Sequence, residues 1–112
     1  MKVIEERIDN VLVARVQETR LDTSISSEMK TELLRLVETE GISNVLLDLA
    51  KVEYADSSGL GALLFGHRQA NAHSGKLKLL NLNPKVQTLM RIAKLETILE
   101  CFQDEEAALK SF

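Results

Sequence analysis

A short motif near the middle of the chain combines hydroxyl, carboxylate and glycine residues at the start of a predicted helix. Its members are Asp56, Ser57, Ser58, Gly59, Leu60 and Gly61. A helix N-terminus presents free N–H groups and a partial positive charge, so it readily holds a negative charge such as a phosphate. A serine at this place is therefore a candidate for phosphorylation or for binding an anion.

Three interpretations of the motif are open from residue types and spacing alone. In the first, Asp56 or Ser57 caps the helix, and the two glycines permit a tight turn with close packing. In the second, a serine hydroxyl is an exposed phosphate acceptor. In the third, the motif cradles a small anion or a nucleotide, although the third glycine of a dinucleotide fingerprint and the lysine of a P-loop are missing.

Residue types elsewhere argue against metal binding and against serine–histidine catalysis. His67 and His73 are six residues apart, unlike the i,i+4 pair of a helical zinc motif, and the single cysteine, Cys101, is distant in sequence. About 13 Å of helix would separate His67 from Ser58, so the two cannot form a nucleophile–base pair. We expect no metal, no cofactor and no enzymatic activity, with His67 in or near the core.

Composition narrows the class of protein further. The 112 residues fit one domain, residues 1–112, and the formal net charge of −3 argues against a direct nucleic-acid binder. The single cysteine excludes an internal disulfide, which suits a reducing cytosol. The sequence has no signal-peptide pattern and no apolar run near the ~20 residues of a membrane span. We therefore expect a cytoplasmic protein without membrane insertion.

The elements that must position the motif alternate between strands and helices. The runs with strand character are residues 3–8, 11–16, 45–49, 76–81 and 98–102. The turn pair Asp9-Asn10 makes a hairpin of the first two runs. The run at 45–49 is apolar enough to be buried on both faces of a sheet. This pattern predicts an α/β fold with a mixed central β-sheet.

About four helices are expected to pack on that sheet, in the order β-β-α-β-α-β-α-β-α. Gly41 and Gly75 stand where the first and second helices should end. The expected capping residues, in chain order, are Asp22, Thr23 or Ser24 for the first helix, Asp56 or Ser57 for the second, Asn83 before Pro84 for the third, and Asp104 for the fourth.

The motif and its neighbours resemble the STAS domain family, and within it the small, free-standing anti-sigma factor antagonists of bacteria. The resemblance covers nearly the whole chain. The matching segments are residues 45–49 and 56–61, Leu21-Asp22, Tyr54-Ala55, Asn83-Pro84 and Glu105-Glu106-Ala107. The chain departs from the family at Thr19-Arg20, because a glycine often precedes the Leu-Asp pair there.

The resemblance implies a mechanism in which the chain is a ligand and a substrate rather than an enzyme. Such proteins, when unphosphorylated, bind an anti-sigma factor that is also a serine kinase, and this binding releases a sigma factor. The kinase phosphorylates the second hydroxyl residue of the motif, which is Ser58 here. The phosphorylated form dissociates, and a serine phosphatase resets it. The resemblance thus implies a phosphoprotein that regulates transcription by partner switching.

The resemblance also implies which residues bind the partner. Asp22 is expected on a loop that faces Ser58, although an N-capping role is equally open for it, and Leu60 can lie in the core or at the interface. The implied partner-binding residues are Asp22, Asp56, Ser57, Ser58, Gly59, Leu60 and Gly61. Two alternatives remain open: a non-phosphorylated STAS scaffold, for example a subunit of a lipid-transport ATPase, and a small nucleotide-binding module.

Overall fold

Seven strands and four helices make up the part of the chain that the computed structural model describes, residues 1–39 and 41–112. The strands are β1 (Val3–Ile8), β2 (Val11–Val16), β3 (Arg20–Leu21), β4 (Asn44–Asp48), β5 (Tyr54–Ala55), β6 (Lys76–Leu80) and β7 (Cys101–Phe102). The helices are α1 (Ser26–Val37), α2 (Ser57–Ala72), α3 (Pro84–Ile92) and α4 (Glu105–Lys110). Apart from β3 and β5, the order is the predicted one, and the predicted α/β fold class is confirmed.

The central sheet contains five strands in the order β1-β2-β4-β6-β7. β1 and β2 form the predicted antiparallel hairpin, and the other neighbouring pairs of this sheet are parallel. Parallel neighbours end at the same edge of a sheet, so the loops that follow β2, β4 and β6 leave the sheet together. The Asp56–Gly61 motif comes after the loop that follows β4.

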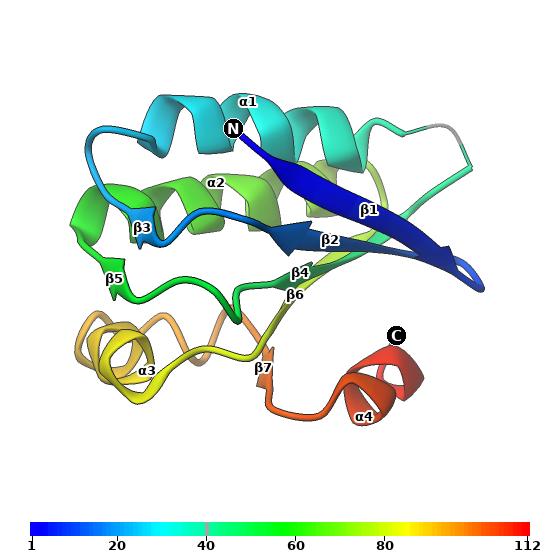
Figure 1. Ribbon diagram of the computed structural model, residues 1–112. Helices are drawn as coiled ribbons and strands as arrows, with labels where there is room; N and C mark the ends of the chain where they lie inside the picture. The colour runs from blue at the N-terminus through cyan, green and yellow to red at the C-terminus, as the bar shows by residue number, and fades with distance from the viewer. Residues whose placement is uncertain (40) are drawn as a thin grey trace.

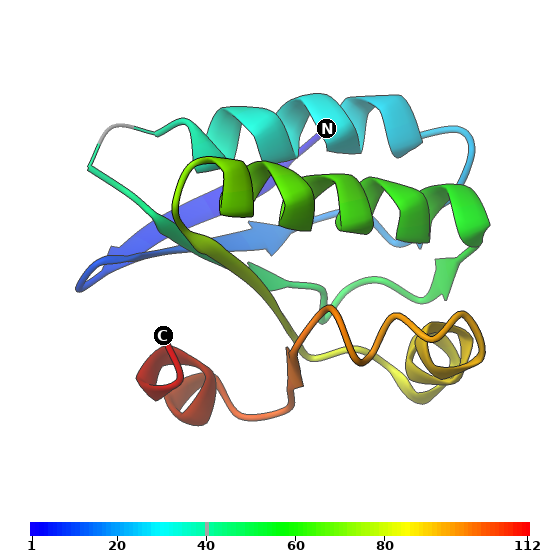
Figure 2. The same cartoon turned by 180° about the vertical axis from the view of Figure 1, so that it is seen from behind.

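Helices cover both faces of the central sheet. α1 and α2 lie side by side on one face, and α3 and α4 lie on the other (Figures 1 and 2). In β4, Val45 and Leu47 join the larger apolar cluster, which includes residues of α1 and α2, while Leu46 joins a smaller one with Ala108 of α4. The prediction that residues 45–49 are buried on both faces is thereby confirmed.

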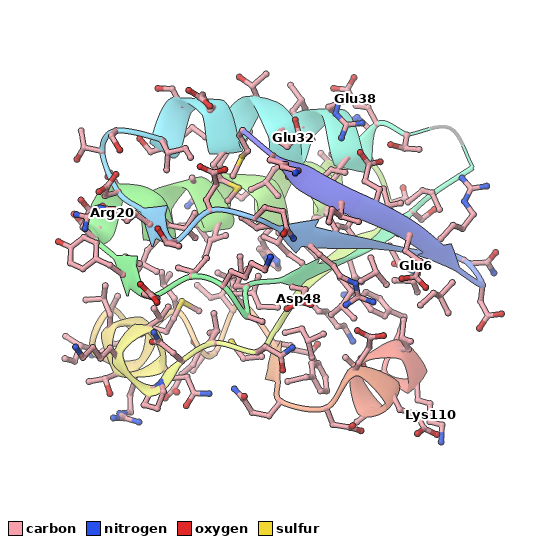
Figure 3. All side chains as sticks on the ribbon, viewed as in Figure 1. Glu6, Arg20, Glu32, Glu38, Asp48 and Lys110 are labelled. Carbon is pink, nitrogen blue, oxygen red and sulfur yellow. The ribbon has the colours of Figure 1, made fainter. Side chains whose placement is uncertain are left out.

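An ionic cluster fastens α4 to the sheet. Arg15 of β2 donates to Asp48 Oδ2 of β4 at 2.9 Å and to Glu105 Oε1 of α4 at 2.6 Å. Asp48, labelled in Figure 3, is only 8% exposed, and it also accepts hydrogen bonds from the backbone of Ala50 and the side chain of Asn81. The Arg15 charge therefore compensates a carboxylate that has little access to water.

We expect Arg15→Gln to destabilise the protein more than Arg35→Gln does. The first change leaves the buried Asp48 carboxylate without its cation, which should lower the free energy of unfolding by about 1–2 kcal/mol. The second removes exposed ion pairs to Glu5 and Glu32, which are worth less than about 1 kcal/mol. Urea denaturation of both variants measures the difference, and equal losses would contradict the role given to Arg15.

The start of α1 differs from the prediction. The N-cap position is Ile25, which makes no capping hydrogen bond with its side chain, so the predicted caps Asp22, Thr23 and Ser24 are wrong. The Asp22 side chain does not cap the helix because Arg20 and Ser24 bind it, whereas the Asp22 carbonyl oxygen accepts the Ser26 N–H at 2.9 Å. The predicted caps of the other helices are confirmed, with Asp56 rather than Ser57 capping α2.

Two element ends also differ from the prediction. α1 ends at Val37 with Glu38 as its C-cap, before Gly41, which has a positive φ of 78° in the loop that follows. The strand expected at 98–102 is reduced to β7, because Ile98 and Leu99 donate their N–H groups to Leu95 in a turn. These ends depend on local turn hydrogen bonds that apolar periodicity does not reveal.

Candidate functional site

A small second sheet, formed by β3 and β5, directly precedes the motif and positions it. β3 and β5 pair in parallel, with Arg20 opposite Tyr54 and Leu21 opposite Ala55. The Asp56 N–H donates to the Leu21 carbonyl at 3.1 Å, so the pairing continues into the motif. This sheet brings the segment that follows β2 beside the segment that follows β4. It was not predicted, because two-residue strands carry no readable periodicity.

Gly59 allows β3 to lie directly against the first turn of α2. A Cβ at this position would stand 1.9 Å from the Leu21 carbonyl oxygen and 2.7 Å from its carbonyl carbon. Leu21 is fully buried, so its backbone cannot move away without disturbing the core. Gly61 differs, because a Cβ there would have no atom within 4 Å. The first glycine of the motif is therefore a packing requirement, and the second is not.

The Ser58 hydroxyl is held at the start of α2 by two side chains. Ser58 Oγ donates to Asp56 Oδ1 at 2.6 Å, and it lies 3.2 Å from Thr23 Oγ1. Asp56 Oδ1 also accepts the backbone N–H groups of Ser58 and Gly59, at 2.9 and 3.1 Å. One carboxylate thus caps the helix and orients the hydroxyl, so the capping and phosphate-acceptor interpretations of the motif are compatible.

Asp22, which precedes Thr23, belongs to the polar cluster around Ser58, whose members are Arg20, Asp22, Thr23, Asp56 and Ser58. Its Oδ2 accepts from Arg20 Nε at 2.7 Å, and its Oδ1 accepts from the backbone and the hydroxyl of Ser24. The Arg20 guanidinium in turn lies 4.5 Å from the centroid of the Tyr54 ring. Asp22 does lie on a segment that faces Ser58, because its neighbour Thr23 contacts the Ser58 hydroxyl.

Both carboxyl groups of the cluster have a lowered pKa. The pKa of Asp56 is lowered chiefly by the Ser58 hydroxyl, and further by the Gly59 N–H. The pKa of Asp22 is lowered chiefly by the Ser24 hydroxyl, and further by Arg20. Both groups are therefore ionised at neutral pH, and the cluster carries two negative charges against the one positive charge of Arg20.

Acid should weaken the fold through these two carboxylates. A carboxyl group whose pKa is lower in the folded state contributes stability above its unfolded pKa, and this contribution disappears as pH falls through the folded value. We expect the free energy of unfolding to decline as pH falls below about 4, and Asp56→Asn to make that decline shallower. Urea denaturation between pH 7 and pH 2 measures both profiles, and parallel profiles would contradict the expectation.

The structure distributes the predicted site residues between surface and interior. Ser57 and Gly61 are exposed, and Asp22, Asp56 and Ser58 are half-buried. Gly59 is buried, and Leu60 is 3% exposed within the core. A partner can therefore contact the exposed and half-buried residues directly. Gly59 and Leu60 are buried, so they support the site through packing.

Sequence reasoning did not assign three further residues to the site, namely Thr23, Arg20 and Tyr54. Thr23 was considered only as a helix cap, and Arg20 only as a departure from the family pattern. A signal existed, because Leu21-Asp22 and Ala55-Asp56 each place an acidic residue after an apolar one at equivalent points behind two parallel strands. That repetition indicates two adjacent strand ends on the same edge.

The described residues 1–39 and 41–112 contain no group of three or more His, Cys, Asp and Glu side chains that could hold a metal ion. None of their helices is long and apolar enough to cross a membrane. His67 is half-buried on α2, with Nε2 3.2 Å from Asn71 Nδ2 and Nδ1 shielded from solvent. This agrees with the boundary position expected for it.

This chain is similar to known proteins both in sequence and in fold. The sequence matches the STAS domain family over residues 2–108. BtrV, a candidate anti-sigma factor antagonist of Bordetella bronchiseptica, is 30% identical over 112 residues, which span 100% of this chain and 95% of that protein. A crystal structure of a candidate anti-sigma factor antagonist from Thermotoga maritima has a TM-score of 0.85 at 19% identity, covering 97% of this chain and 92% of that chain.

A further solved relative is known in two chemical states. The anti-sigma factor antagonist SpoIIAA, in its unphosphorylated form, has a TM-score of 0.68 at 20% identity, covering 98% of this chain and 96% of that chain. SpoIIAA of Bacillus in its phosphorylated form has a TM-score of 0.69 at 20% identity, covering 99% and 100%. These likenesses support the fold, and the family match spans almost the whole sequence. The chain therefore belongs to the STAS domain family.

Proposed function

We propose that this protein is an anti-sigma factor antagonist that acts in the cytoplasm and is switched off by phosphorylation of Ser58. In its unphosphorylated form it binds an anti-sigma factor that is also a serine kinase, and so releases a sigma factor. The observation that carries the proposal is the Ser58 hydroxyl, which is half-buried at the N-terminus of α2 and held by Asp56 and Thr23. The chain is then the substrate and ligand of its partner and not an enzyme.

The position of Ser58 suits a modification that changes binding without changing the fold. A phosphate adds about −1.5 to −2 charge and three acceptor oxygens. The N-terminus of α2 can accept this charge in the free protein, because its N–H groups and dipole favour anions. In a docked complex the same charge must be desolvated beside Asp56, where it opposes binding. A serine phosphatase would restore the binding form by removing it.

The surface beside Ser58 offers room for a partner. A groove of about 220 Å³ lies between β5 and α3, lined by Tyr54, Lys85 and Leu89 among others. Tyr54 is 46% exposed, and large aromatic side chains frequently anchor protein interfaces. The proposed docking surface therefore combines the polar cluster around Ser58 with this partly apolar groove.

The names of the relatives support the same role. BtrV, 30% identical to this chain, and SpoIIAA, which shares its fold, are described as anti-sigma factor antagonists, with a phosphorylated form known for SpoIIAA. The proposal extends that role to this chain, together with the kinase, the phosphatase and the sigma factor as its partners.

A competition experiment tests the proposed role. Serine kinases of the histidine-kinase-like ATPase type, encoded near this gene, are each mixed with their bound sigma factor and then titrated with the unphosphorylated protein. We expect one kinase to bind this protein and release its sigma factor, as followed by analytical size-exclusion chromatography. Failure to displace a sigma factor from any such kinase would contradict the proposal.

A further inference from the structure

Arg20 is the one cation in the cluster of described residues around Ser58, and most of its hydrogen-bonding groups are unused. Its Nε donates to Asp22 at 2.7 Å, and its guanidinium stacks against the Tyr54 ring. The side chain is 60% exposed. A guanidinium carries five N–H donors in a planar fork, and within residues 1–39 and 41–112 only Nε has a hydrogen-bond partner. The two Nη groups are therefore available to an anion.

The register of the β3–β5 pair places Arg20 within reach of Ser58. Side chains two residues apart on a strand share a face, so Arg20 and Asp22 of one segment share a face with Tyr54 and Asp56 of the other. Arg20 and Asp56 are diagonal across this pair, with about 8 Å between their backbones from the ordinary strand spacing and rise. An arginine side chain can span that distance, and Figure 3 shows Arg20 beside the start of α2.

An electrostatic coupling agrees with this placement. The pKa of Arg20 is raised chiefly by its hydrogen bond to Asp22, and the Asp56 charge is among the further causes. Asp56 Oδ1 accepts the Ser58 hydroxyl at 2.6 Å. The Arg20 guanidinium therefore interacts electrostatically with a carboxylate that is adjacent to the oxygen on which a phosphate would be formed.

Phosphorylation of Ser58 would change the hydrogen bonds of the cluster. Esterification removes the Oγ proton, so Asp56 loses that donor and keeps the backbone N–H groups of Ser58 and Gly59. The phosphate would then lie close to the carboxylates of Asp56 and Asp22, with Arg20 as the available counter-charge. Thr23 Oγ1 lies 3.2 Å from Ser58 Oγ and donates to Asp56 Oδ2 at 3.4 Å, and rotation of this hydroxyl can turn its one proton to an ester or phosphate oxygen.

We propose that Arg20 is a phosphate-binding residue in cis, whose Nη groups bind the phosphate carried by Ser58 while Nε keeps its bond to Asp22. The inference rests on the proposed phosphorylation of Ser58. Tyr54 holds the guanidinium plane in place by stacking, so the arginine is positioned before the phosphate arrives. Arg20 thereby stabilises the dianionic phosphate against the two neighbouring carboxylates.

The second ionisation of the phosphate reports this contact. Phosphoserine ordinarily loses its second proton near pH 6, and a bound guanidinium lowers this pKa whereas Asp22 and Asp56 raise it. Phosphoserine is installed at position 58 during translation, so that no kinase is needed, and the phosphorus NMR signal is titrated from pH 4 to pH 9. Arg20→Gln and Arg68→Gln are made in the same phosphorylated protein, together with Arg20→Lys.

We expect Arg20→Gln to raise the second pKa of the phosphate by roughly half a unit or more. Arg20→Lys should raise it less, because a charge remains while the stacked fork is lost. Arg68 lies ten residues further along α2, about 15 Å away, so Arg68→Gln should leave the pKa unchanged. An unchanged or lowered pKa in Arg20→Gln, or an equal rise in Arg68→Gln, would overturn the assignment. Since no kinase takes part, neither result depends on whether the proposed function is correct.

Discussion

Replacing Ser58 with glutamate is expected to weaken binding to the anti-sigma factor kinase about 100- to 1000-fold. A loss of ~2.8–4 kcal/mol corresponds to that range, and an unpaired charge that must be desolvated can supply it. The added carboxylate would stand beside Asp56, which already accepts the Ser58 hydroxyl and two backbone N–H groups. Isothermal titration of the kinase with wild type and Ser58→Glu measures the loss.

A matched control shows whether the loss of affinity comes from a charge at position 58 or from a charge at any helix N-terminus. Ser27 is exposed and is the second residue of α1, just as Ser58 is the second residue of α2. Ser27→Glu therefore adds the same charge at the same helical position, at a residue that makes no hydrogen bond to Asp56 within residues 1–39 and 41–112, and should leave the affinity close to that of wild type. Similar affinities for Ser58→Glu and wild type, or similar losses in both variants, would exclude a charge switch at Ser58.

Replacing Gly59 with alanine is expected to lower the free energy of unfolding by about 2–3 kcal/mol. The new Cβ would overlap the Leu21 carbonyl at 1.9 Å, so β3 or the first turn of α2 must move. Leu21 is fully buried in the core, which makes that movement costly. The melting temperature should fall by roughly 10 °C, as measured by circular dichroism.

Gly61→Ala provides the control for this substitution. A Cβ at Gly61 meets no atom within 4 Å, and alanine is a better helix former than glycine by about 0.5–1 kcal/mol. Gly61→Ala should therefore leave the melting temperature unchanged or raise it. Equal destabilisation by the two changes would show that the contact between Gly59 and Leu21 does not support the site.

Most of the fold could be predicted because long elements carry strong periodic signals. The hairpin of β1 and β2 followed from two apolar runs around Asp9-Asn10, and the doubly buried β4 followed from its continuous apolar run. The caps Asp56, Asn83 and Asp104 were identifiable because each precedes a helical pattern with a suitable side chain. Ser57 is not the cap of α2, which the residue types alone could not distinguish.

The contacts around Ser58 could be predicted only in part. The motif itself was evident, and Asp22 was expected to face Ser58 from the family resemblance. The short pair β3–β5, which sets the register of Arg20 against Tyr54, depends on contacts between residues more than thirty positions apart. The repeated apolar–acidic pairs Leu21-Asp22 and Ala55-Asp56 hint at this pairing, but strands of two residues carry no periodicity that sets the register, so Thr23 and Arg20 were not recognised as neighbours of the site.

The phosphorylation site can be measured directly by intact-mass spectrometry after incubation with the cognate kinase and ATP. We expect wild type and Ser57→Ala each to gain one phosphoryl group, and Ser58→Ala to gain none. Both serines lie in the same motif, so the pair distinguishes the second hydroxyl from the first. A phosphoryl group on Ser58→Ala at the wild-type level, or its loss from Ser57→Ala alone, would contradict the assignment of Ser58 as the switch.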